Sequence, residues 1–456
     1  MNSPSKKILV IGFHFPPSAE VGAIRTQKFV KYLPEFGWTP HVLSIGEAFI
    51  SRRDDKRLED VKEAAVTRTS VWRTPLQMAL ELRNKLGRNK KAQATSAASA
   101  QTLFYESKPT PFIKRLLFSL NWLPDDKMCW IIPAVIAGYR TIKQQQIKHI
   151  YVSAPPHSTA VVGYLLSLLT GARLVIDFRD PWLIDYCKRP EQLRTSITDW
   201  MHRILEGLVV RRAEVVINVS DRLSSALRAA HPDEQADKFQ TITNGFDAED
   251  FKALTSIKPS TDKFVISYLG TFYLHRSPDL FLRAIKSLIE TGFFAPDQIE
   301  IRFIGWVATA KGVAVETLIA ENGLEECVKV IGTVPYADAL KFMAESHALL
   351  LLAQQQYYGI PAKAFDYLAV GKPILALTSQ GDTADIITQL NAGKVADPYD
   401  AKEIAEAIKQ LYREASGQRT EQCWERPDVS GYARRDLARR LAILLGDSPS
   451  HSDTLK

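Results

Sequence analysis

Cysteine and paired metal ligands are the scarcest features of this 456-residue chain. It has four cysteines and no Cys-x-x-Cys, Asp-x-Asp or His-x-His pair. A disulfide framework needs closely spaced cysteines and a metal site needs clustered ligands, so neither is expected. The sequence therefore predicts a protein without a bound metal or other cofactor, in a reducing compartment.

Long apolar runs are also missing. The nearest candidate, residues 128–138, is interrupted by Pro133 and is shorter than the roughly 20 residues that span a bilayer. No apolar region of signal-peptide length precedes the first strand-like run. We expect a cytoplasmic protein, either free or held peripherally at the inner face of the membrane.

The balance of charge is only mildly basic, with 58 Lys and Arg against 51 Asp and Glu. Part of the excess lies in a predicted flexible insertion, residues 51–110, where strand patterns are weak and a basic cluster contains no acid. This cluster is either a solvated loop or a contact for an anionic membrane surface or acceptor. Nucleic-acid binding is not expected, because no recognition motif is present. The cluster consists of Arg83, Lys85, Arg88, Lys90 and Lys91.

Strand-like apolar runs alternate with helical patterns along most of the chain, which indicates an α/β fold with parallel sheets. Two successive doubly wound halves account for the order. We expect an N-terminal domain over residues 1–250, a linker over 250–263, a C-terminal domain over 251–429, and a last amphipathic helix within 430–446. The expected strands are residues 8–11, 40–44, 150–153, 173–176, 215–218, 264–269, 300–304, 328–331, 348–352 and 373–377.

The loops that follow these strands carry a series of motifs. The first loop reads Gly-Phe-His-Phe-Pro-Pro and ends at Pro17, with Gly22 and Arg25 after it. No Gly-x-Gly-x-x-Gly occurs, so a dinucleotide fingerprint is absent. The later motifs are Asp-Phe-Arg-Asp-Pro-Trp at 177–182, Asn-Gly-Phe-Asp at 244–247, Leu-Gly-Thr-Phe at 269–272 and Gly-Ile-Pro-Ala-Lys-Ala-Phe-Asp-Tyr at 359–367.

Taken in this order, the motifs resemble those of the family 4 glycosyltransferases over almost the whole chain. The resemblance implies the GT-B architecture, in which two Rossmann-like domains face a cleft and the final helix crosses back to the first domain. It also implies transfer of a sugar from a UDP or GDP type nucleotide-sugar to a glycan or lipid-linked acceptor, with retention, in bacterial surface polysaccharide or glycoconjugate synthesis.

The chemistry of one helix start favours the same assignment. Gly359 and Pro361 precede a helix, whose first N–H groups suit a phosphate. Lys363 lies in the first turn, where the helix dipole disfavours a cation unless an anion binds. Asp366, one turn later, can accept hydrogen bonds from ribose hydroxyls. We further expect Arg276, with His275 beside it, near the diphosphate; the remaining expected donor residues are Gly270, Thr271, Gly332 and Thr333, of which the last two rest on the resemblance alone.

The chain departs from the family pattern at the Glu-x7-Glu motif. Asp366 occupies the second acidic position, and Tyr358 stands at the first. Tyr358 can hydrogen-bond a sugar but offers no carboxylate. The donor sugar is thus left open by the motif.

In the N-terminal half, His157 and Asp180 are the candidate catalytic residues beside the acceptor, with Arg179 keeping Asp180 ionised. The alternative for both is a structural role. Two other functions stay open at this point: a catalytically weak binding or scaffold protein of the same fold, and a nucleotide-sugar 2-epimerase.

Overall fold

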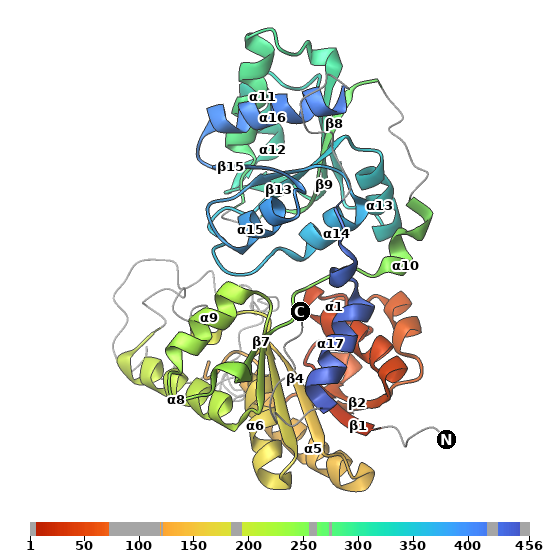
Figure 1. The fold of residues 1–456 in the computed structure, drawn as a ribbon, viewed down its shortest axis with the longest axis vertical. Coiled ribbons are helices and arrows are strands. Elements are labelled where there is room, and N and C mark those ends of the chain that lie inside the picture. Colours follow the sequence, from red (N-terminus) through yellow and green to blue (C-terminus); the bar gives the residue numbers. More distant parts are fainter. Residues whose placement is uncertain are drawn as a thin grey trace, which may run out of the picture. The chain divides into compact units, whose positions relative to one another are not determined.

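The computed structural model describes residues 6–72, 119, 122–183, 194–254, 262–272, 276–416 and 427–446. The chain divides into two units (Figure 1). The first comprises residues 1–218, 224–240 and 438–456, and the second 219–223 and 241–437. The main change from one unit to the other thus falls after Gln240, ten residues before the predicted boundary. Two predictions, the basic cluster at 83–91 and His275, lie outside the described residues.

The first unit is built on a seven-stranded sheet with the order β3-β2-β1-β4-β5-β6-β7. Its strands are β1 Lys6–Ile11, β2 Trp38–Ile45, β3 Ala65–Thr69, β4 His149–Ala154, β5 Arg173–Phe178, β6 Val215–Asn218 and β7 Phe239–Thr241. Its helices are α1 Val21–Tyr32, α5 Ile131–Gln145, α6 Ser158–Thr170, α8 Ser196–Arg212 and α9 Asp221–Ala230, with short 3-10 turns at Leu33–Phe36, Glu47–Phe49, Asp55–Val61, Met128–Trp130 and Ala236–Lys238.

The second unit contains a six-stranded parallel sheet with the order β12-β9-β8-β13-β14-β15. Its strands are β8 Phe264–Thr271, β9 Ile299–Trp306, β12 Val328–Gly332, β13 Ala348–Leu352, β14 Ile374–Leu377 and β15 Gly393–Ala396, with a small hairpin of β10 Thr309–Ala310 and β11 Val313–Ala314. Its helices are α10 Ala248–Phe251, α11 Asp279–Glu290, α12 Val315–Asn322, α13 Tyr336–Ala344, α14 Ala362–Val370, α15 Asp382–Gln389 and α16 Ala401–Ala415, with 3-10 turns at Lys252–Leu254, Pro296–Gln298 and Ser430–Tyr432.

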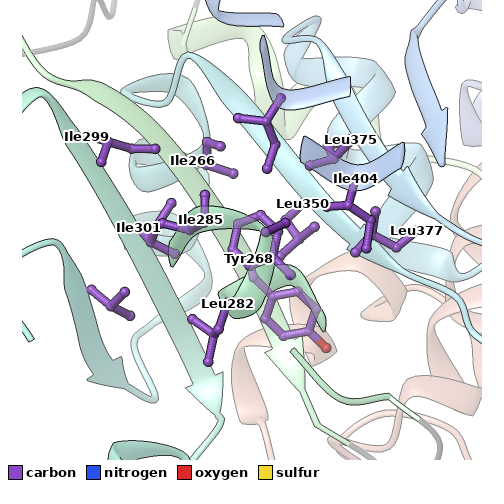
Figure 2. Close-up of a cluster of buried hydrophobic side chains, with 14 of the residues drawn as sticks. Ile266, Tyr268, Leu282, Ile285, Ile299, Ile301, Leu350, Leu375, Leu377 and Ile404 are labelled. Carbon is purple, nitrogen blue, oxygen red and sulfur yellow. The ribbon is translucent and has the colours of Figure 1, made fainter. Parts of the chain in front are cut away.

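Both faces of the second sheet are buried, as expected for a parallel sheet covered by helices. Along β13, Leu350 and Leu352 belong to one apolar cluster, and Leu349 and Leu351 belong to the other. Figure 2 shows the first cluster, in which side chains from α11 meet those of the central strands. A continuous run of leucines is therefore what this position in the sheet requires.

Helix α17, Arg434–Gly446, contributes to both units, because the division falls between Leu437 and Ala438. In the second unit, the Arg434 N–H donates to the Phe246 carbonyl (2.8 Å). In the first unit, the Arg173 guanidinium donates to the carbonyls of Leu444 and Leu445. Among the helices of the described ranges, none has the length and apolarity to cross a bilayer.

The predicted insertion begins too early. Residues 55–61 form a 3-10 turn and β3 pairs in parallel with β2, so the first sheet extends into the range predicted as an insertion. The strand was missed because β3 is an edge strand, and most of its side chains are only partly buried. Its sequence, Ala-Val-Thr-Arg-Thr, has no apolar run.

A buried ion pair joins α1 to the first sheet. The Arg25 guanidinium contacts the Asp177 carboxylate through Nε (2.6 Å) and Nη2 (3.1 Å), and the Tyr151 hydroxyl donates to the same carboxylate. Arg25 and Asp177 are almost fully enclosed. Because a buried charge is costly without its partner, the three groups form one unit of stability.

We predict that Arg25→Met lowers the free energy of unfolding by about 3–5 kcal/mol, because it leaves the Asp177 carboxylate buried and uncompensated. Urea denaturation measures this loss. The double variant Arg25→Met/Asp177→Asn removes the stranded charge and should recover part of the stability. An equal loss in both variants would show that the ion pair is not the cause.

Candidate functional site

The strand order of the second sheet reverses between β8 and β13. From β8 the sheet continues to β9 and β12 on one side, and from β13 to β14 and β15 on the other. Ligands of open α/β sheets bind at such a switch point, outside the carboxyl ends of the strands. The predicted donor residues Gly270 and Thr271 end β8, and the segment after β13 leads into α14.

Two glycines open the space above this point. Gly270 and Gly305 are register partners on β8 and β9, with φ of +138° and +117°. A Cβ on Gly305 would lie 2.2 Å from the Gly270 carbonyl oxygen, and one on Gly270 would lie 3.3 Å from Lys363 Nζ. The lysine side chain thus lies close over the end of β8, where Gly270 has no side chain to crowd it.

Lys363 is held there by neutral groups. Its Nζ donates to the Leu269 carbonyl (3.2 Å) and lies 3.7 Å from the centre of the Tyr268 ring. No residue of the described ranges forms an ion pair with it. Burial lowers the pKa of Lys363 well below its usual range, and the positive charge of Arg276 lowers it further.

The start of α14 adds to this positive potential. Its N-cap residue, Pro361, provides no side-chain cap, and the first turn contains no acidic residue. The first N–H groups of a helix carry a partial positive charge. Lys363, Arg276 and the helix start therefore form a site that favours an anion.

The loop before α14 is fixed by a short chain of hydrogen bonds. Arg276 Nη2 donates to Gln356 Oε1 (3.0 Å), and Gln356 Nε2 donates to the Gly359 carbonyl (3.4 Å). The Gly359 N–H donates to Asp382 Oδ2 (2.6 Å). Tyr358, half-buried, comes directly before this glycine.

Asp382 was not predicted from the sequence. It begins α15 and is buried. Its carboxylate accepts a hydrogen bond from the N–H of Gly359, the residue that follows Tyr358. The signal available in the sequence was the Gly-Asp pair at 381–382, where a helix follows a strand. That pattern is common at helix starts, so it did not distinguish Asp382 from other capping residues.

Asp366 has different neighbours from Lys363, although both are on α14. It accepts a hydrogen bond from the Tyr336 side chain of α13, and the charges of Arg434 and Asp250 act on it in opposite directions. Burial raises the pKa of Asp366 to about 7. Tyr336 follows the predicted nucleobase residues Gly332 and Thr333 by a few positions in the sequence.

The first sheet also reverses its strand order, between β1 and β4. Its predicted residues Pro17 and Gly22 follow β1, and His157 follows β4. A Cβ on Gly22 would lie 2.8 Å from a guanidinium nitrogen of Arg179, so this glycine admits the arginine at the start of α1. Arg179 also donates to the Pro155 carbonyl, and burial lowers its pKa.

The two predicted catalytic residues differ in exposure. Asp180 is exposed. His157 is buried and stacks on Trp182, with ring centres 4.8 Å apart, and Trp182 Nε1 donates to His202 Nδ1 (3.0 Å). The stack fixes the plane of the imidazole, a feature compatible with either role.

Arg25 and His14 change the list of candidates at this edge. Arg25 was predicted as a loop residue of the acceptor side. Its guanidinium instead forms the buried ion pair with Asp177 inside the first unit. His14, which was quoted only as part of the loop motif, is half-buried, and Glu20, Arg179 and Lys127 act on it electrostatically. Burial lowers its pKa.

No group of three or more His, Cys, Asp or Glu side chains suited to a metal occurs in the part of the chain that the structure describes. Cationic side chains lie at both switch points, Lys363 and Arg276 in the second unit and Arg179 in the first. Such an arrangement binds and stabilises an anionic group directly, through ammonium, guanidinium and backbone N–H donors.

Residues 251–425 match the family model of "Glycosyl transferases group 1". Over these residues the chain is similar to the glycosyltransferases of that group. The match lies within the predicted C-terminal domain, 251–429, and confirms the glycosyltransferase family that the motifs indicated.

One curated relative and two solved structures show the range of similarity. A 100-residue stretch is 29% identical to the amylovoran biosynthesis glycosyltransferase AmsK of Erwinia amylovora, and it spans 21% of this chain and 24% of that protein. Anabaena Alr3699/HepE, solved with UDP and glucose, superimposes with a TM-score of 0.61 at 17% identity over 97% of this chain and all of that one. A glycosyltransferase from Rickettsia africae gives 0.61 at 14% identity over 97% and 98%. These structural matches confirm the predicted GT-B fold for this glycosyltransferase domain and its N-terminal partner.

The raised pKa of Asp366 makes the stability of this protein depend on pH. Its value of about 7 lies above the ordinary 3.8, so between these values the folded protein binds more protons than the unfolded chain. Stability contributed by the neutral carboxyl is therefore lost as the pH rises towards 7. We predict that Asp366→Asn raises the Tm over wild type more at about pH 8 than at about pH 5.

Differential scanning fluorimetry measures both shifts. Asp338→Asn, which removes a half-exposed carboxylate that pairs with Lys341 (3.2 Å) on the neighbouring helix α13, is the control for the change in net charge. Equal Tm shifts of Asp366→Asn at the two pH values would contradict the burial of this carboxyl.

Proposed function

We propose that this protein transfers a sugar from a nucleoside diphosphate-sugar to an acceptor hydroxyl. The observation that carries the proposal is Lys363. Its ammonium group lies at the start of α14, close to Arg276, with a carbonyl and an aromatic ring as its contacts. A diphosphate supplies the negative charge that this arrangement favours, and it is the leaving group of such a transfer.

Within this proposal, we give the following parts to the predicted donor residues. Lys363, Arg276 and the first N–H groups of α14 hold the diphosphate and stabilise the charge that develops as the sugar leaves. Asp366 accepts hydrogen bonds from the ribose hydroxyls, and the Gly332–Thr333 loop lies against the base. Tyr358 and Asp382 face the sugar, where Asp382 supplies the carboxylate that position 358 lacks.

Several finer points rest on similarity to other proteins. The HepE structures contain UDP and, in one case, UDP-glucose, so UDP-glucose is the first donor to test. AmsK is a glycosyltransferase of amylovoran biosynthesis, which favours a polysaccharide or glycoconjugate product with a glycan or lipid-linked acceptor. Retention of configuration follows from the motif resemblance, with the departing phosphate assisting deprotonation of the acceptor.

The acceptor side belongs to the first unit in this proposal. Arg179, laid over the start of α1, and His14 supply positive or neutral hydrogen-bond donors. Asp180 is the exposed carboxylate available to an acceptor hydroxyl. His157, in the loop after the preceding strand β4, is the second candidate group. Pro17 and Gly22 shape the loop through which these groups are reached.

A screen of UDP- and GDP-sugars by mass spectrometry tests the function directly. Slow release of the nucleoside diphosphate from one donor, accelerated by an acceptor, is the expected result. Binding of a donor without any release would favour the scaffold alternative. Conversion to a sugar epimer without release would favour the 2-epimerase.

We predict that Lys363→Met weakens donor binding about 10- to 100-fold, because it removes a charged hydrogen bond to the diphosphate. Isothermal titration calorimetry with the donor found in the screen measures the change. Lys372→Met is the matched control, since it removes the same charge just beyond the opposite end of α14. If both variants lose affinity equally, the diphosphate does not bind at the helix start.

A further inference from the structure

Helix α8 exposes an apolar stripe along its length. Ile197, Trp200, Ile204 and Leu208 follow one another at helical spacing, and all four are exposed, Trp200 by 62%. A surface helix of a globular protein normally presents polar residues on this side. Packing among the described residues of the first unit therefore does not explain the stripe.

The opposite side of α8 supplies the packing that the fold needs. Thr198, His202, Glu206 and Val209 are buried there, and Val209 belongs to the core cluster under the sheet. A capping box between Thr195 and Thr198 fixes the start of the helix. The exposed stripe thus has a defined orientation and a rigid support.

Two neighbouring helices also expose apolar side chains. Helix α6 contacts both α5 and α8, and all three contribute to the same core cluster, so they cover one face of the sheet. Of the 19 large apolar side chains that are exposed in the described ranges, nine are on these three helices. The other five of the nine are Ile132, Ile136 and Tyr139 on α5, and Leu168 and Leu169 on α6.

The charges on these helices are almost entirely of one sign. Helices α5 and α6 contain no acidic residue. In α8, Asp199 forms an ion pair with Arg194 (3.0 Å), and Glu206 is buried against His231 (3.2 Å). The exposed basic residues of the three helices are Arg140, Lys143, Arg203, Arg211 and Arg212.

We propose that the outer face of α5, α6 and α8 docks on the surface of a bilayer that contains anionic lipid. Basic residues around an apolar stripe are the composition of helices that lie in the membrane interface. Tryptophan and tyrosine favour the headgroup level, where Trp200 and Tyr139 would lie. Arg211 also lies 3.9 Å from Glu234, and Arg212 donates to Ser167. The exposed cations still outnumber the acids of these helices, which suits an anionic headgroup layer.

This surface is distinct from the basic cluster at 83–91, and it does not depend on the proposed transfer reaction. A rigid helix face defines which side of the first unit meets the lipid. Docking of that face would bring the acceptor-side unit to the membrane whatever donor the second unit binds.

Vesicle flotation of the full chain tests the proposal. We expect binding to vesicles of phosphatidylcholine with 30% phosphatidylglycerol, weakening as salt is added, and much weaker binding to phosphatidylcholine alone. Arg203→Gln/Arg211→Gln should weaken binding roughly 25-fold, since each cation near an anionic surface contributes a factor of about five. Trp200→Ser/Ile204→Ser should weaken it about tenfold or more.

Matched controls lie in the second unit. Tyr399→Ser and Arg283→Gln remove an exposed aromatic ring and an exposed arginine there, and both should bind as wild type does. Circular dichroism establishes that each variant is folded. Because every variant keeps residues 83–91, a loss in the α8 variants reports on α8.

Three results would overturn the proposal. They are equal binding to vesicles with and without anionic lipid, wild-type binding by both α8 double variants, and no binding to either vesicle at low salt. Sedimentation equilibrium could give a fourth contradicting result. A concentration-dependent dimer that Trp200→Ser/Ile204→Ser converts to a monomer would assign this face to self-association instead.

Discussion

The donor-side arrangement depends on one electrostatic constraint, the cation at Lys363. A positive charge at a helix start is opposed by the dipole of that helix, and here Arg276 adds a second positive charge. The neighbours of the ammonium group in the described ranges, a carbonyl and the Tyr268 ring, compensate it only in part. An anion relieves all three effects at once. Gly270 serves this purpose, because it leaves room for the lysine over the end of β8, and Gly305 leaves room for the Gly270 backbone.

The first unit also has a cationic side chain over the start of a helix, formed by different residues. Arg179 lies over the start of α1, where Gly22 provides the space, as Gly270 does for Lys363. In each unit the cation lies at the switch point of the sheet, next to backbone N–H donors. Two doubly wound units that share this feature are suited to a reaction between two partners of which at least one is anionic. The arginine that is nearest in sequence to this loop, Arg25, is instead committed to the buried pair with Asp177.

Much of the fold was predictable because parallel strands buried on both faces need continuous apolar runs, such as 348–352. Predictions failed where burial is partial, as for the edge strand β3, or where partners are distant in sequence. Arg25 and Asp177 are 152 residues apart, and the Asp366 carboxyl is surrounded by groups from three other helices. The carboxylate of Asp382 reaches the donor-side loop only through tertiary structure. The exposed apolar stripe of α8 could not be predicted from the sequence for a related reason. Apolar residues occur on more than one side of this helix, and only the fold shows which side is buried.

A crystal structure of the complex with UDP tests the central claim most directly. The account predicts that a diphosphate oxygen lies within hydrogen-bond distance of Lys363 Nζ and of a first-turn N–H of α14, with a ribose hydroxyl at Asp366. The nucleotide bound elsewhere, with Lys363 still against Leu269 and Tyr268 and the start of α14 unoccupied, would contradict it.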